Sequence, residues 1–138
     1  MSNPNDWNKA VIDEFRANGG KVGGPMAGAP LLLLTTTGAK TGRRHTSPVM
    51  YNTDGNRLLV FASKAGAPTH PAWYHNLVAN PRVTVEQGTE TFEANAVVLT
   101  GEERDRLYRR HAEQFPQFGE YETKTTRQIP VVALDRVG

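Results

Sequence analysis

Apolar residues near the N-terminus recur with the period of a helix. Trp7, Val11 and Phe15 are spaced by four and share one helical face, and the glycine pair 19–20 follows as a stop signal. This pattern predicts a short amphipathic helix. The stretch 21–30 is rich in glycine and has no periodic pattern, so it predicts a flexible link.

From residue 31 onward, short apolar runs alternate with turn residues. This pattern predicts antiparallel strands joined by tight turns. Strands are predicted at residues 31–37, 45–53 and 57–63, in the two arms of a hairpin over 82–99, and at 129–137.

Two helices are inserted between these strands. Residues 69–81 predict a short helix capped by Thr69, and residues 100–115 predict a longer helix opened by a capping box of Thr100 and Glu103. The chain lacks the regular alternation of strands and helices that is typical of a parallel sheet.

Six or so antiparallel strands with inserted helices predict a mainly β fold, a small barrel. We expect residues 1–30 to form an N-terminal appendage, made of the helix and the link. Residues 31–138 are expected to form the barrel domain.

Composition narrows the functions that this fold can serve. The 138-residue chain has 16 Lys and Arg, 14 Asp and Glu, a net charge of +2 and no cysteine. The lack of cysteine excludes disulfides, thiol catalysis and thiolate metal sites. The histidines lack paired ligand spacings, so no metal is expected. Positive charge gathers at residues 40–44, which favours a small anionic ligand over nucleic acid.

Hydropathy bears on location. The longest apolar run, residues 29–34, is too short to span a bilayer, and the polar N-terminus is unlike a secretory signal. We therefore expect a cytoplasmic protein with no transmembrane segment. Peripheral membrane contact through the N-terminal helix is a further expectation.

The segment TTTGAKTGRRHTSPVMY (35–51) gathers basic residues between two predicted strands. Gly38 and Gly42 can take positive φ, which would turn successive backbone N–H groups toward an anion. Lys40 and the two arginines that follow add positive charge and bidentate donors. The alternative is a solvated hairpin tip whose charges keep a sheet edge soluble.

The segment FASKAGAPTHPAWYHN (61–76) repeats this arrangement. A strand end and a glycine-containing turn bring Lys64 before the N-terminus of a helix, and helix N-termini attract anions. Two such features can clamp one elongated anionic ligand. Helical spacing favours core packing for Trp73 and leaves Tyr74 open between the core and a site.

A third feature is a run of aromatic residues. Phe115, Phe118 and Tyr121 recur every three residues around Pro116 and Gly119, which interrupt a long helix. We expect a short turn that presents three rings to one side, as a lid over the core or as the wall of a pocket for a flat ring. The N-terminal helix is expected to close over this turn as a mobile cover.

Reactive side chains are scarce by comparison. Ser47 and Ser63 have no GxSxG elbow around them, and solvation explains Glu120 and Glu122 better than an acid–base pair does. The basic segments match neither a Walker loop nor GxGxxG. This imbalance between binding groups and reactive groups indicates that a cofactor carries the chemistry.

The blocks TTTGAKTGRRHTSPVMY and FASKAGAPTHPAWYHNLVANPRV, with the aromatic segment before TRQIPVV, resemble the deazaflavin-dependent nitroreductase family. The resemblance runs in unbroken order from about residue 30 to the C-terminus. It implies a split β-barrel of the flavin-reductase and pyridoxamine-phosphate-oxidase-like type. It also implies hydride transfer from reduced coenzyme F420, a deazaflavin, to an electron-poor acceptor such as a quinone, an enone or a nitro compound.

The resemblance further implies which residues form the site. The cofactor would contact Ala39, Lys40, Thr41, Arg43, Arg44, His45, Thr46, Ser47, Pro48, Val49, Phe61, Ala62, Ser63, Lys64, Ala72, Trp73, Tyr74, His75, Asn76 and Phe118. Phe115, Phe118 and Tyr121 would contact the acceptor, and Tyr121, Ser63 or water would supply a proton. The family's nitroimidazole-activating member has tyrosines at the positions of Phe115 and Phe118.

Two rival functions fit the same residues. The barrel could bind FMN in place of the deazaflavin, or it could carry a deazaflavin or a lipid without turnover. The partner of the enzyme would be a small-molecule acceptor. The residues leave both a monomer and a homodimer open.

Overall fold

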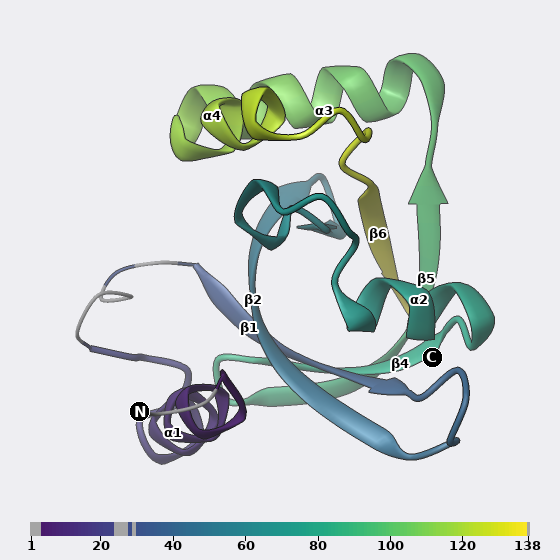
Figure 1. Cartoon of the computed structure of the whole chain (residues 1–138). Coiled ribbons are helices and arrows are strands. Elements are labelled where there is room, and N and C mark those ends of the chain that lie inside the picture. Colours follow the sequence, from purple (N-terminus) through teal and green to yellow (C-terminus); the bar gives the residue numbers. More distant parts are fainter. Residues whose placement is uncertain (1–3, 24–27, 29, 138) are drawn as a thin grey trace.

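Six antiparallel strands close into a barrel in the computed structural model of this chain, which describes residues 4–23, 28 and 30–137 (Figure 1). Around the barrel the strands follow the order β1-β2-β3-β6-β5-β4. The elements are α1 (Pro4–Ala17), β1 (Leu31–Thr37), β2 (Arg44–Asp54), β3 (Arg57–Phe61), the 3-10 helix η2 (Lys64–Gly66), α2 (Ala72–Ala79), β4 (Arg82–Gln87), β5 (Glu90–Leu99), α3 (Gly101–Gln114), α4 (Gln117–Lys124) and β6 (Val131–Arg136). The predicted antiparallel barrel with inserted helices is confirmed.

Strand β2 changes partner halfway along its length. Residues 44–50 pair with β1, whereas pairing with β3 begins at Tyr51. The first half of β2 therefore has a strand neighbour on one side only. The Tyr51 N–H donates to the carbonyl of Pro30 on the β1 side, so the nitrogen of Pro48, three residues earlier, faces the open edge. Proline suits this position because no N–H is needed there.

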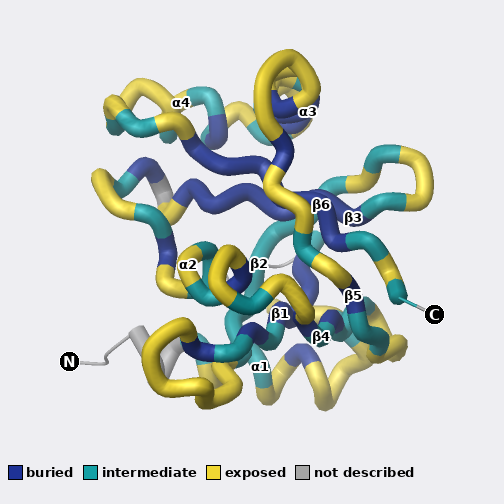
Figure 2. The backbone as a smooth tube through the Cα atoms, turned by 90° about the vertical axis from the view of Figure 1, so that its right-hand side faces the viewer, coloured by how far each residue is buried: buried dark blue, intermediate teal, exposed yellow. Residues whose placement is uncertain are grey.

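Four consecutive leucines in β1 are buried because this strand is covered on both faces. Leu32 and Leu34 belong to the interior cluster of the barrel, and Leu31 and Leu33 pack against α1. None of the four is more than 6% exposed. In Figure 2 the strands accordingly form the buried centre, while the outer turns of the helices are exposed.

Helix α1 packs against the barrel. Phe15 is 1% exposed and Val11 is 8% exposed, and both contact the leucines of β1. The expectation that these two residues close over the aromatic segment is wrong. The side chain of Trp7 and half of the predicted link at 21–30 lie outside the described residues, and the division of the chain at residue 30 stays a prediction.

The C-terminal end of α1 is fixed to the β4–β5 hairpin. Arg16 donates from Nε and Nη2 to the two carboxylate oxygens of Glu86 at 3.0 and 2.8 Å. A Cβ on Gly20 would lie 2.6 Å from the Cα of Gly88, so the backbones meet where no side chain fits. The glycines predicted to stop the helix therefore also allow it to dock.

The predicted helix caps are wrong. The Thr100 side chain makes no capping hydrogen bond, and only its carbonyl accepts from the N–H of Arg104, at 3.4 Å. Gly101, at φ +63°, turns the chain between the hydroxyl and the first helical amides. Helix α2 begins after Pro71, two residues beyond Thr69, whose hydroxyl accepts from Lys64 Nζ instead.

The aromatic segment is also more regular than expected. It forms helix α4 rather than a non-helical turn, and Gly119 lies within that helix. Pro116 stands just before the first helical residue, where a missing N–H costs nothing. Helices α3 and α4 lie together above the barrel in Figure 1.

Candidate functional site

A cavity of about 460 Å³ opens beside the unpaired half of β2. This volume is within the usual range of small-molecule sites. The cavity lies between the open edge of β2, the end of β3, and helices α1, α2 and α4. Its walls are formed by Asn8, Ser47, Pro48, Val49, Met50, Phe61, Ser63, Lys64, Pro71, Trp73, Phe118 and Tyr121.

Nine of these wall residues were among the predicted site residues, and the structure brings them together from segments far apart in the chain. Asn8, Met50 and Pro71 were missed. Met50 and Pro71 carried a signal, because each extends a block of predicted residues, 43–49 or 72–76, by one position. Trp73 both packs against the interior cluster and lines the cavity, so core packing and a site position are compatible for this residue.

Aromatic rings form one wall of the cavity. Phe118 is 4% exposed and meets Phe61 and Tyr121 edge to face, with ring centroids 5.9 and 5.1 Å apart. The hydroxyl of Tyr108 donates to the carbonyl of Phe118 at 2.6 Å and fixes α4 in place. Burial raises the pKa of Tyr108, so this donor stays protonated. Phe115 does not line the cavity and packs instead on His111, with ring centroids 5.0 Å apart.

His111 stands behind this wall and was not singled out as a site residue from the sequence. Its ring stacks on Phe61 with centroids 3.8 Å apart, and no part of it is exposed. Asn52 donates to Nδ1 at 3.0 Å, which assigns the proton of the neutral ring to Nε2. Burial, and then the charge of Arg110, lower the pKa of His111 to about 4. Its position on the apolar face of α3 was the available signal.

The segment after β3 is held in an unusual conformation. Lys64 has φ +47°, a region that costs a residue with a side chain about 1–3 kcal/mol. Gly66 has φ +81°, and a Cβ there would lie 3.0 Å from the Tyr121 carbonyl. This segment therefore presses directly against α4, so the wall that carries Lys64 and the wall that carries Tyr121 are in contact.

The basic turn between β1 and β2 differs from the predicted anion nest. Gly42 has φ +71° as expected, but Gly38 is not in the left-handed region. Glycine is needed at 38 for space, since a Cβ would lie 2.7 Å from Thr41 Oγ1. The N–H groups of Gly38 and Gly42 bond to carbonyls within the turn, and that of Ala39 bonds to Asn76 Oδ1 at 3.1 Å. The predicted convergence of amides on an anion is therefore wrong.

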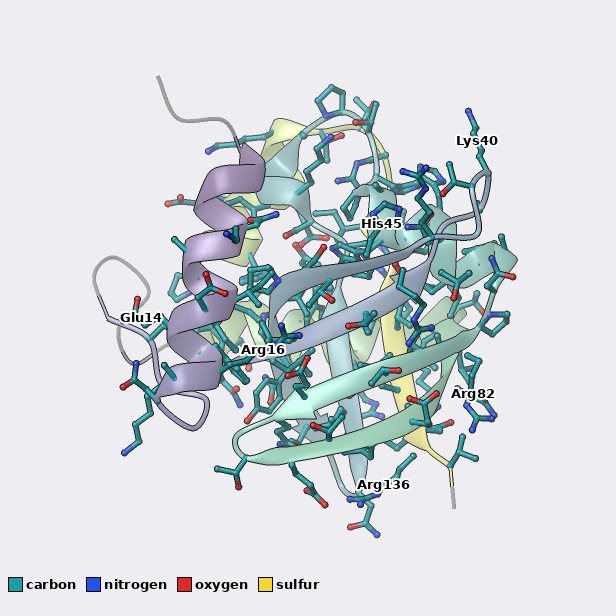
Figure 3. The ribbon with its side chains drawn as sticks, turned by 90° about the horizontal axis from the view of Figure 1, so that it is seen from below. Glu14, Arg16, Lys40, His45, Arg82 and Arg136 are labelled. Atoms are coloured by element: carbon teal, nitrogen blue, oxygen red, sulfur yellow. The ribbon has the colours of Figure 1, made fainter. Side chains whose placement is uncertain are left out.

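The cations of this turn are arranged differently from one another. Lys40 and Arg43 are exposed, and neither forms an ion pair within residues 4–23, 28 and 30–137. Figure 3 shows Lys40 extending from the tip of the turn. Arg44 donates to the hydroxyls of Thr37 and Thr84 at 3.0 and 2.5 Å. Two of the three predicted cations are thus available to a ligand.

The remaining predicted residues lie around the cavity rather than in its wall. His45 is exposed on the same face of β2 as Ser47, nearer to the turn. Thr46 bonds to Thr35 between their hydroxyls at 2.8 Å. Asn76 joins α2 to β1 by donating to Thr36 Oγ1 at 3.2 Å. The predicted residues that are absent from the cavity wall are Ala39, Lys40, Thr41, Arg43, Arg44, His45, Thr46, Ala62, Ala72, Tyr74, His75, Asn76 and Phe115.

Other features of the described residues offer less chemistry. A second cavity of about 220 Å³ lies between α1 and the β4–β5 hairpin, and its polar groups include the Arg16–Glu86 ion pair. Within the described ranges there is no cluster of three His, Asp or Glu side chains that could hold a metal ion. No helix of these ranges is long and apolar enough to cross a membrane.

Comparison with known proteins gives a consistent result. The family described as F420H(2)-dependent quinone reductase matches residues 7–136. The F420H(2)-dependent quinone reductase Rv1261c of Mycobacterium tuberculosis is 40% identical over 126 residues, which cover 88% of this chain and 85% of that protein.

Solved structures agree with this match. The F420-H2 dependent reductase FDR-A is 41% identical, with a TM-score of 0.70 over 77% of this chain and 94% of the other. A structure described as a domain-swapped dimer is 37% identical, with a TM-score of 0.72 over 96% of this chain and 100% of the other. A Listeria innocua protein assigned to the pyridoxamine 5'-phosphate oxidases is 13% identical with a TM-score of 0.56 over 79% and 85% of the two chains, so it shares the fold alone.

Proposed function

Since this chain belongs to the F420H(2)-dependent quinone reductase family, we propose that it transfers a hydride from reduced coenzyme F420 to a quinone bound in the cavity beside β2. The chain is accordingly an oxidoreductase, and coenzyme F420 is its cofactor. The observation that carries the proposal is the cavity itself, where aromatic rings from β3 and α4 face the open edge of β2.

The residues present fit this cofactor. A deazaflavin is flat and apolar at its ring and anionic at its phosphate, and the cavity joins an aromatic wall to Lys64 and the two serines. Lys40 and Arg43 stand beyond it, exposed at the end of β2. Guanidinium and ammonium groups bind phosphate through charge-assisted hydrogen bonds. We assign the ring to the side of Phe61 and Trp73, and the anionic tail to Lys64 and the turn beyond it.

When bound, coenzyme F420 supplies the hydride. Reduction of a quinone by one hydride needs one further proton to give the hydroquinone. Tyr121 lies in the cavity wall and Ser63 is 8% exposed there, and we assign the proton delivery to these hydroxyls. Tyr121 is the first choice because it lies on the α4 wall that faces the acceptor. The remaining work of the chain is to orient two flat molecules, and such positioning can contribute several kcal/mol.

The acceptor class follows from the composition of the α4 wall. Phe118 contributes an apolar ring and no hydroxyl, so within this wall Tyr121 provides the hydrogen-bonding group. We propose that quinones are the preferred acceptors, with enones next and nitro compounds last. Phe118→Tyr adds a donor and should raise kcat/KM for polar nitroaromatics relative to that for quinones.

The rivals raised by the sequence are decided by the family. The family uses coenzyme F420 and not FMN, and its members are named as enzymes and not as carriers. A cytoplasmic location and peripheral membrane contact are part of the proposal, although Val11 and Phe15 are already buried and cannot anchor the helix. Both a monomer and a homodimer stay open, and light scattering of the purified protein distinguishes them.

The direct test is titration followed by turnover. Purified protein is titrated with oxidised F420 and with FMN by fluorescence, and reduced F420 is then mixed with quinones, enones and nitroaromatics while its oxidation is followed by absorbance. We expect saturable binding of F420 and fastest oxidation by quinones. Preferential binding of FMN, or F420 binding without oxidation by any acceptor, would contradict the proposal.

A further inference from the structure

Arg127, between α4 and β6, was not predicted as a site residue, yet its guanidinium holds the whole segment after β3. Its Nε donates to the carbonyl of Ala67 at 2.9 Å, and Nη2 donates to that of Ser63 at 2.7 Å. Its Nη1 donates to the carbonyl of Ala62 at 3.1 Å and to Nδ1 of His70 at 2.9 Å. Four of the five N–H groups of this side chain are therefore directed at one short stretch of chain.

The setting of Arg127 differs from that of an ordinary structural arginine. Arg104, which is 6% exposed, donates to the carbonyl of Ile129 and also has Asp105 and Glu122 within 3.1 and 3.9 Å. Within the described ranges no carboxylate lies within ion-pair distance of Arg127. Its charge is met by carbonyl dipoles and one imidazole alone. Such an arrangement fixes backbone rather than neutralising an acid.

The segment that Arg127 holds needs an external constraint. Lys64 is in the left-handed region at φ +47°, where a side chain is rarely found without surrounding support. On the other side, Gly66 meets the Tyr121 carbonyl and the Lys124 side chain. The segment is thus clamped between the guanidinium and α4, and its side chains at Ser63 and Lys64 are delivered to the cavity wall.

We propose that Arg127 is a positioning residue for cofactor binding, which acts by holding the carbonyls of residues 62, 63 and 67 so that Lys64 faces the bound anion. The inference rests on the proposed function, because it assigns Lys64 to coenzyme F420. Under this proposal cofactor affinity depends in part on Arg127, which is not in the cavity wall and does not contact the ligand.

The test compares two arginines that donate to backbone carbonyls, the half-buried Arg127 and the buried Arg104. Arg127→Met keeps an unbranched apolar stem and removes the donors, and Arg104→Met is the control that removes donors which do not bond to this segment. Each variant is measured for F420 affinity by fluorescence, for melting temperature, and for amide hydrogen exchange without cofactor at Gly66 and Ala67, whose N–H groups bond to the carbonyls of Ser63 and Lys64.

We expect Arg127→Met to raise the Kd for F420 by about tenfold or more and to speed exchange at both amides by a similar factor. Arg104→Met should lower the melting temperature while its Kd stays within about twofold of the wild type. Arg127→Lys, which keeps the charge and a single donor nitrogen, should be intermediate. It carries the same test if the methionine variant does not fold.

A double-mutant cycle with Lys64→Ala establishes the route of the effect. If Arg127 acts through Lys64, the two losses of affinity are less than additive. Fully additive losses, or an unchanged Kd in Arg127→Met with the melting temperature lowered as in Arg104→Met, would overturn the positioning role. If the wild type itself fails to bind F420, the proposed function fails. Faster exchange in Arg127→Met would then leave Arg127 as an anchor of the segment only.

Discussion

The β1–β2 turn and the segment after β3 look alike in the sequence and differ in the structure. Each places a lysine and at least one glycine directly after a strand. The turn directs the N–H groups of Gly38 and Gly42 to its own carbonyls, exposes Lys40 and Arg43, and does not line the cavity. The segment holds Lys64 at positive φ, between Arg127 and α4, in the cavity wall. The same residue types thus serve two purposes. In the turn they form a solvated attractor, a set of exposed charges that draws in an anion. After β3 they form a rigid support, a fixed segment that presents Lys64 to the cavity.

The difference teaches where each region should tolerate change. Exposed charges act at long range, so their contributions are small and are screened by salt. A clamped segment acts through geometry, so one misplaced atom affects both its own fold and the wall that it touches.

The largest expected difference separates two glycines with similar backbone angles. Gly66 has φ +81° with the Tyr121 carbonyl 3.0 Å from its Cβ position, whereas Gly42 has φ +71° with no atom within 4 Å. Gly66→Ala should lower the free energy of unfolding by about 2–4 kcal/mol, and Gly42→Ala by about 1 kcal/mol from backbone strain alone. Urea denaturation measures both, and equal losses would contradict the difference in packing.

The next prediction concerns His111, which packs behind the aromatic wall of the cavity, and it is tested by the pH dependence of stability. His111 has a pKa of about 4 in the fold, below the ordinary value of 6.5. The unfolded chain therefore binds the proton more readily, so the contribution of this residue is present above about pH 6.5 and lost as the pH falls toward 4. We expect up to about 3 kcal/mol of stability to be lost over this window. His111→Gln should show a shallower dependence, and an unchanged slope would contradict the assignment.

Tyr121 tests whether the α4 wall carries chemistry as well as packing. Tyr121→Phe keeps the ring that meets Phe118 and removes only the hydroxyl. We expect kcat with a quinone to fall about a hundredfold, while the Kd for F420 stays nearly unchanged. Steady-state kinetics and the fluorescence titration give the two values. Equal losses of both would assign the ring of Tyr121 to the cofactor, and no loss would leave α4 as a cover for the core.

The barrel was predictable because its determinants are local. The alternation of strands, the helical period of Val11 and Phe15, and the buried leucines of β1 all depend on neighbours within a few residues. Nine of the twelve residues of the cavity wall could be located by motif. The caps at Thr69 and Thr100 could not be decided, because a hydroxyl caps only if the chain enters the helix at the right angle.

The roles of Arg127 and His111 could not be predicted from the sequence, for a different reason. Arg127 is more than fifty positions from the carbonyls that it holds, and nothing near it in the chain indicates those partners. His111 sits on an apolar helix face, where a sequence pattern cannot separate a packed ring from an exposed one. Non-local contacts of this kind decide how Lys64 is presented, although the lysine itself was predicted.

Substitutions in the β1–β2 turn should have the smallest effect on the Kd for F420. The salt dependence of that effect distinguishes the turn from the segment after β3. Lys40 and Arg43 are exposed, so each contact with an anionic tail should contribute about 0.5–1 kcal/mol. Lys40→Ala should raise the Kd for F420 about threefold, and the double alanine variant about tenfold. Because exposed charges are screened, the effect of the double variant should shrink as sodium chloride rises from about 0.05 to 0.5 M. Lys64 is also exposed, but it lies in the cavity wall, where a bound ligand covers it, so the loss caused by Lys64→Ala should change less. Arg109→Ala, which removes an exposed charge from α3, is the control and should leave the Kd unchanged. If salt reduces the effect of the turn variants and the effect of Lys64→Ala on the Kd by the same factor, the two regions hold the anion by the same means. That result would contradict the distinction between attractor and support.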